Sequence, residues 1–125
     1  MTTSLEQARR FLSLARDNLA AFLALAALKH IRPALAFFHA QQAIEMSLKA
    51  VLFAHGLEFP KTHDLYELAD HLDRAGITLP IDAGELARIN PYAVEFRYGE
   101  ETLPNLSQNE VEAMATRMLA WAEAT

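Results

Sequence analysis

The 125-residue chain contains no cysteine, only four glycines and one tryptophan. Without cysteine it can form no disulfide, no thiolate metal site and no cysteine nucleophile. Its longest apolar run, Leu19 to Leu28, has ten residues, whereas a membrane-spanning helix needs about twenty. We therefore expect this run to lie in a buried helix. Cysteine-free chains suit a reducing compartment, and the N-terminal stretch has no apolar signal-peptide core, so we expect a cytoplasmic protein.

Positive charge is also scarce, with 11 Lys and Arg against 16 Asp and Glu, for a net charge of -5. Broad binding to nucleic acid requires a basic face that displaces counterions. We therefore do not expect broad nucleic-acid binding. A local basic patch is compatible with this charge, because the net value averages over the whole surface.

Residues that favour helices are abundant and β-branched residues are few, which predicts an all-α fold. A chain of this length fits one domain and buries roughly two-thirds of its unfolded surface. No internal repeat, low-complexity tract or flexible linker divides it. We therefore predict that residues 1–125 form a single domain, a compact antiparallel bundle of four to five helices.

Start and stop signals place the helices. The first is expected to begin near Ser4, where Thr3 with Glu6, or Ser4 with Gln7, fits a capping box. Pro33 suits the first turn of a second helix. This helix should extend to His55, because Gly56 can follow as a left-handed C-cap. A third helix is predicted from His63 to Ala75, capped by Thr62 or Asp64 and ended by Gly76. A short helix is predicted from Asp82 to Ile89, with another turn or more from Tyr92 to Tyr98. The last helix should begin at the capping box of Ser107 and Glu110.

The second helix is apolar on nearly every side except for a polar stripe. At about 100° per residue, His39, Gln42 and Lys49 share one face, and Glu45 lies at its edge. Buried polar groups without partners cost about 1–3 kcal/mol each, so the stripe needs partners. In a structural interpretation, Glu45 and Lys49 form an i,i+4 pair and the others tie this helix to its neighbours. In a functional one, the stripe lines a cleft or subunit interface that binds a polar ligand. Spacing alone favours the structural interpretation.

Two other places in the chain are candidate sites. His63 and Asp64 stand at a helix start, which can bind an anion or can simply be capped. Arg97 can bind a phosphate and Tyr98 can stack on a base, but a surface ion pair of Arg97 with Glu95 or Glu58 and a core position for Tyr98 are slightly favoured. No catalytic triad, phosphate-binding glycine loop or convergent set of zinc ligands is evident. We therefore predict no catalytic residue, no metal site and no cofactor.

Three segments occur in a characteristic order: FHAQQAIE at 38–45 followed by LKAVL at 48–52, FPKTHDL at 59–65, and YAVEFRY at 92–98. Together they resemble the central helix, the Thr-His-Asp-Leu segment and the late Arg-Tyr segment of HEPN-domain proteins. The resemblance spans most of the chain. It departs from the family at Met46, where relatives often carry lysine, and at Gly99, where proline often follows Arg-Tyr.

The resemblance implies a four- to five-helix bundle that usually forms homodimers. It also implies a small bacterial or archaeal protein, often encoded beside a minimal nucleotidyltransferase. Such proteins are thought to bind nucleotides or to act as the partner of that enzyme, also in toxin-antitoxin pairs. On this basis the candidate ligand-binding residues are His39, Gln42, Glu45, Lys49, His63, Asp64, Arg97 and Tyr98.

Some HEPN proteins are instead dimeric, metal-independent ribonucleases with a late Arg…His motif. The last histidine of this chain is His71, so no late arginine can be followed by one. Arg32 and His39 have a permissible separation, but the family does not place its motif at the start of the second helix. We therefore predict a binding protein rather than an enzyme. A ribonuclease that uses Arg32 and His39, and an interaction module without a small-molecule site, are the alternatives.

Overall fold

The computed structural model describes residues 3–93 and 106–125. Within these residues all regular secondary structure is helical and there is no strand, which confirms the all-α prediction. The elements are α1 (Ser4–Ala26), α2 (Pro33–Ala54), α3 (Leu65–Arg74), α4 (Ala83–Ile89), the 3-10 helix η1 (Asn90–Ala93) and α5 (Gln108–Glu123).

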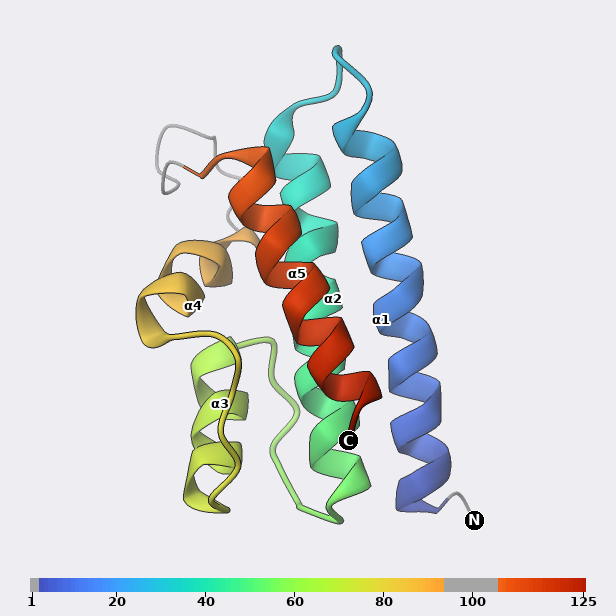
Figure 1. The fold of residues 1–125 in the computed structure, drawn as a ribbon, viewed down its shortest axis with the longest axis vertical. Helices are drawn as coiled ribbons and strands as arrows, with labels where there is room; N and C mark the ends of the chain where they lie inside the picture. Colours follow the sequence, from blue (N-terminus) through green and yellow to red (C-terminus); the bar gives the residue numbers. More distant parts are fainter. Residues whose placement is uncertain (1–2, 94–105) are drawn as a thin grey trace.

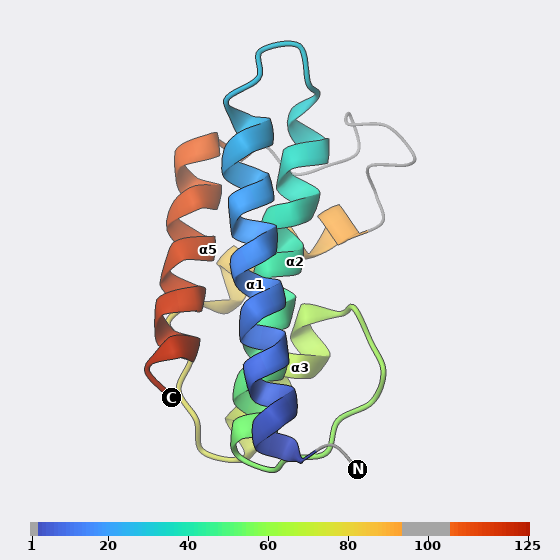
Figure 2. The ribbon, with the colours of Figure 1, turned by 90° about the vertical axis from the view of Figure 1, so that its right-hand side faces the viewer.

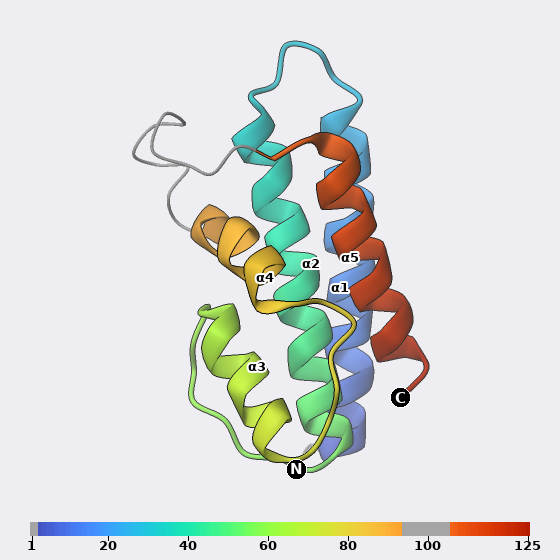
Figure 3. The same cartoon turned by 60° about the vertical axis from the view of Figure 1, so that its left-hand side comes forward.

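Helix α2 is the centre of the bundle. Figure 1 and Figure 2 show that α1 runs antiparallel to α2 along its whole length, and that α5 lies beside both and runs antiparallel to α1. The shorter helices α3 and α4 cover another side of α2, away from α1 (Figure 3). Every other element except α4 therefore has its main contact with α2, as expected for a helix that is apolar nearly all round.

The core forms along α2. Ile44, Leu48 and Leu52 are completely buried. Near the start of the helix, the ring of Phe37 lies 6.3 Å from that of Phe22 on α1 and 5.3 Å, edge to face, from that of Tyr92 in η1. One residue of α2 thus joins two sides of the bundle.

The helix starts follow the capping chemistry of the sequence. Thr3 caps α1, because its hydroxyl oxygen accepts a hydrogen bond from the backbone N–H of Glu6. Ser107 and Glu110 form a complete capping box at the start of α5. Asp64 rather than Thr62 caps α3, so that helix begins at Leu65, two residues after the predicted start. The second capping box, at α4, joins Asp82 and Glu85.

The helix ends depend on two glycines. Helix α2 ends at Ala54, one residue before the prediction, and His55 is its C-cap. Gly56 follows with φ +65°, and Gly76 has φ +79° just after α3. Other residues rarely adopt this left-handed conformation, so both glycines end their helices as predicted.

Candidate functional site

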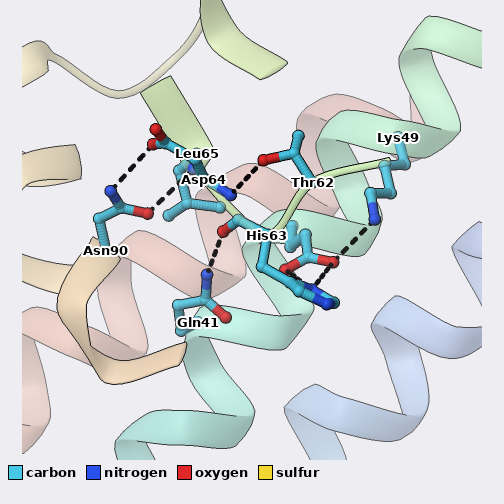
Figure 4. Close-up of polar contacts among 8 residues, drawn as sticks. Gln41, Lys49, Thr62, His63, Asp64, Leu65 and Asn90 are labelled. Carbon is cyan, nitrogen blue, oxygen red and sulfur yellow. Dashed lines mark hydrogen bonds and ion pairs between the residues drawn. The ribbon is translucent and has the colours of Figure 1, made fainter. Parts of the chain in front are cut away.

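Glu45 is the centre of a polar cluster on α2. Its side chain is fully buried, and Lys49 Nζ lies 2.9 Å from Oε2. Nδ1 of His63 lies 3.1 Å from both carboxylate oxygens (Figure 4). A buried carboxylate is stable only when its lone pairs have charged or hydrogen-bonding partners. Glu45 therefore holds a lysine from its own helix and a histidine from the segment that follows α2.

The segment that carries His63 is fixed by two further amides. Nε2 of Gln41, on α2, donates to the backbone carbonyl of His63 over 3.3 Å. Oδ1 of Asn90 accepts a hydrogen bond from the backbone N–H of Leu65 at 2.9 Å, and Nδ2 of Asn90 donates one to the Asp64 carboxylate at 3.1 Å (Figure 4). Neither amide was among the predicted site residues. The contacts of both amides join positions more than twenty residues apart, so no local sequence pattern predicts them.

A cleft of about 880 Å³ lies beside this cluster, between the start of α1, the end of α2 and residues 57–63. Four of its lining side chains are basic or can become cationic, and one is acidic. In the described part of the chain, neither Arg10 nor Lys61 makes an ion pair. The ionisable lining residues are Arg10, Lys49, Lys61 and His63, with Glu58 as the acid.

Aromatic rings form an apolar wall of the same cleft. Phe53 stacks on Phe11 with 5.3 Å between ring centroids and meets Phe59 edge to face at 5.1 Å. The guanidinium of Arg10 lies 5.9 Å from the centre of the Phe11 ring. The cleft thus offers flat apolar faces next to positive charge, an arrangement suited to an anion that carries a planar group.

The structure brings only part of the predicted set together. Lys49 and His63 line the cleft and Glu45 lies behind them. Asp64 caps α3 and lines a different hollow beside that helix. Gln42 lines no described cleft, and its amide oxygen is buried without a partner among the described residues. The remaining two residues, Arg97 and Tyr98, lie outside the described residues, as does most of the predicted turn from Tyr92 to Tyr98.

His39 faces α1 instead of the cleft. Its Nδ1–H donates to the amide oxygen of Asn18 at 3.0 Å, and the Asn18 amide N–H donates to the backbone carbonyl of Leu14. Burial lowers the pKa of His39 below the ordinary value of 6.5, because the charged imidazolium is poorly solvated there. His39 therefore ties α2 to α1, as the structural interpretation of the stripe proposed.

The lowered pKa of His39 predicts a pH dependence of stability. Because the folded state binds this proton less tightly than the unfolded state, His39 favours folding fully above pH 6.5, and this contribution is lost as the pH falls below that value. Urea unfolding of wild type and His39→Gln at pH 7.5 and pH 5 measures it. We expect the variant to lose less stability on acidification. Equal losses would contradict a neutral, partly buried His39.

Arg32 and His39, the pair considered for ribonuclease activity, are well separated. Arg32 is the exposed N-cap of α2, whereas His39 lies seven residues later, about 10 Å along a helix axis. Nδ1 of His39 is already bonded to Asn18. Within one chain, the two residues therefore lie at different heights along the axis of α2.

Among the described residues no group of three or more His, Asp or Glu side chains could hold a metal ion, and no helix is long and apolar enough to cross a membrane. The fold is a helical bundle in which a Thr-His-Asp-Leu segment is tied to a central helix. A family model of the HEPN domain matches residues 1–123, and the chain belongs to this family. Neither a curated protein nor a solved structure matches it significantly.

Proposed function

We propose that the protein binds a nucleotide in the cleft between α1, the end of α2 and residues 57–63. The observation that carries the proposal is the gathering of Arg10, Lys49, Lys61 and His63 beside the aromatic wall. The cations would hold the phosphates and a phenylalanine face would contact the base. The volume, about 880 Å³, is in the usual range of roughly 300–1,000 Å³ for small-molecule sites.

Arg10 and Lys61 are the best residues for testing the phosphate contacts. Both are exposed and make no ion pair in the described part of the chain. Lys49 is less suitable, because its ammonium neutralises the buried Glu45 and its loss would disturb folding as well. An exposed ion pair contributes up to about 1 kcal/mol, and an arginine that forms charge-assisted hydrogen bonds contributes more.

Isothermal titration with ATP should show that Arg10→Ala raises Kd about tenfold and Lys61→Ala about fivefold, corresponding to roughly 1.4 and 1 kcal/mol. Arg9→Ala is the matched control, because Arg9 is also exposed on α1 but is not among the residues that line the cleft. It should change Kd by less than about twofold. Absence of binding to any common nucleotide would refute the proposal. If Arg9→Ala and Arg10→Ala raised Kd equally, the ligand would bind outside this cleft.

We also propose that the protein forms a homodimer through the end of α1. The prediction that Leu19 to Leu28 lies in a buried helix is wrong for part of this run, because α1 ends at Ala26 and Leu23 and Leu28 are 44% and 46% exposed. Leu23→Glu should shift the protein from dimer to monomer in light scattering, because a charge buried in an apolar interface is costly. Leu5→Glu, an exposed position at the other end of α1, should leave the dimer intact. A monomeric wild type would contradict this proposal.

The last part of the proposal is a nucleotidyltransferase partner, in a toxin-antitoxin type pair in the cytoplasm. Family membership supports it. If a small nucleotidyltransferase is encoded beside this protein, the two should elute as one complex after co-expression. Separate elution would count against the pairing.

A further inference from the structure

The ring of His63 is largely exposed, but it contacts a buried carboxylate, that of Glu45. Its side chain is 70% exposed, yet Nδ1 lies 3.1 Å from both oxygens of the fully buried Glu45. A carboxylate can only accept hydrogen bonds, so Nδ1 must carry the hydrogen and donate it. In the neutral imidazole the other nitrogen, Nε2, then has no hydrogen and is an acceptor. Glu45 therefore fixes the tautomer of His63, and the ring lines the cleft with Nε2 available to a ligand.

We propose that the cleft takes up a proton when it binds a phosphate, and that the proton goes to Nε2 of His63. This inference rests on the proposed nucleotide site. Phosphate oxygens are acceptors, and so is Nε2 of the neutral ring, so the two cannot form a hydrogen bond without an added proton. In the imidazolium both nitrogens donate, Nδ1 to Glu45 and Nε2 to the phosphate. Glu45 acts as a positioning residue in this arrangement.

The charges around His63 decide when the proton enters. Arg10 comes from α1 and Lys49 from α2, and both line the same cleft. Glu58 and Lys61 line the cleft as well, and Asp64 directly follows His63 in the chain, so further charges of both signs are present. All of these groups and Glu45 are present whether the cleft is empty or filled. A bound phosphate adds negative charge beside the ring, which favours the imidazolium relative to the empty cleft.

Proton uptake can be measured directly. Titrations with ATP at pH 7.5 in buffers of different ionisation enthalpy give the number of protons bound per ligand. ATP titrates as well, so the decisive quantity is the difference between wild type and His63→Gln. Glutamine keeps a hydrogen-bond donor but cannot change its charge. We expect wild type to take up about half a proton more than the variant, and its affinity to rise several-fold more between pH 8 and pH 6.5.

Nitrogen-15 NMR of the histidine rings provides a second readout on the unmodified protein. Without ligand at pH 8, we expect a protonated Nδ1 and an unprotonated Nε2 for His63; with ATP at pH 7, both should be protonated. If ATP binds and the His63→Gln variant takes up as many protons as wild type, the inference is wrong but the nucleotide site stands. The opposite tautomer in the empty protein would also overturn the inference. If wild type binds no nucleotide, the proposed function fails and this inference fails with it.

Discussion

Glu45→Gln is expected to lower the free energy of unfolding by about 3 kcal/mol. Glutamine keeps the shape of the side chain but removes its charge, which leaves Lys49 without an anion. The Lys49 side chain is only 12% exposed, and removing one partner of a buried ion pair costs about 3–5 kcal/mol. We expect the lower end of this energy range because the Lys49 ammonium can turn toward the neighbouring cleft, where it is hydrated.

The control for Glu45→Gln removes both charges. Glu45→Leu combined with Lys49→Met replaces the pair with apolar groups, a change that is often neutral or stabilising. We expect the double variant to lie within about 1 kcal/mol of wild type. Urea unfolding followed by circular dichroism at pH 7 measures all three proteins. If Glu45→Gln alone were as stable as wild type, the carboxylate could not be a buried partner of Lys49.

The helices could be predicted because their signals are local. The capping box at Ser107 and Glu110, and the glycines at positions 56 and 76, involve residues within one or two turns of each other. Helix boundaries depend on such neighbours more than on distant contacts. The remaining errors in the helix bounds are of one or two residues. The predicted last residue of α2, His55, is the C-cap that follows Ala54. The predicted first residue of α3, His63, lies two residues before Leu65.

The site could be predicted only where it follows the period of one helix. Glu45 and Lys49 are four residues apart, so their ion pair is already implied by the sequence. Arg10 and Lys61 were not predicted, because the cleft forms where residues 57–63 approach the start of α1. Gln41 was missed because its partner is the backbone of His63, which carries no sequence signal. Tertiary packing decides these contacts.

The residues of the polar stripe on α2 meet two different neighbours, for a geometric reason. Six residues separate His39 from Glu45, and at about 100° per residue they point about 120° apart. His39 consequently meets Asn18 on α1, whereas Glu45 meets His63 on the other side. The structural interpretation therefore applies at His39, whereas the functional one is proposed only for the end that carries Glu45 and Lys49.

Phe22→Ala is expected to cost about 4 kcal/mol, the largest effect of any single change considered. The ring is fully buried and packs against Phe37 across the interface of α1 and α2, and such truncations lose both transfer energy and packing. Leu5→Ala, at an exposed position on the same helix, should cost less than about 1 kcal/mol. Phe22→Leu should lose an intermediate amount, so that the effect is measurable even if the alanine variant is largely unfolded.

The same variants test whether residues 1–125 fold as one domain. Trp121 is the only tryptophan and packs against the core from α5, whereas Phe22 lies on α1. If the bundle unfolds as one unit, Phe22→Leu must shift the tryptophan fluorescence transition and the circular dichroism transition by the same amount. A fluorescence transition that stayed in place would mean that α5 unfolds independently of α1. The shared core around α2 argues against this, because α1 and α5 both pack on that helix and on each other.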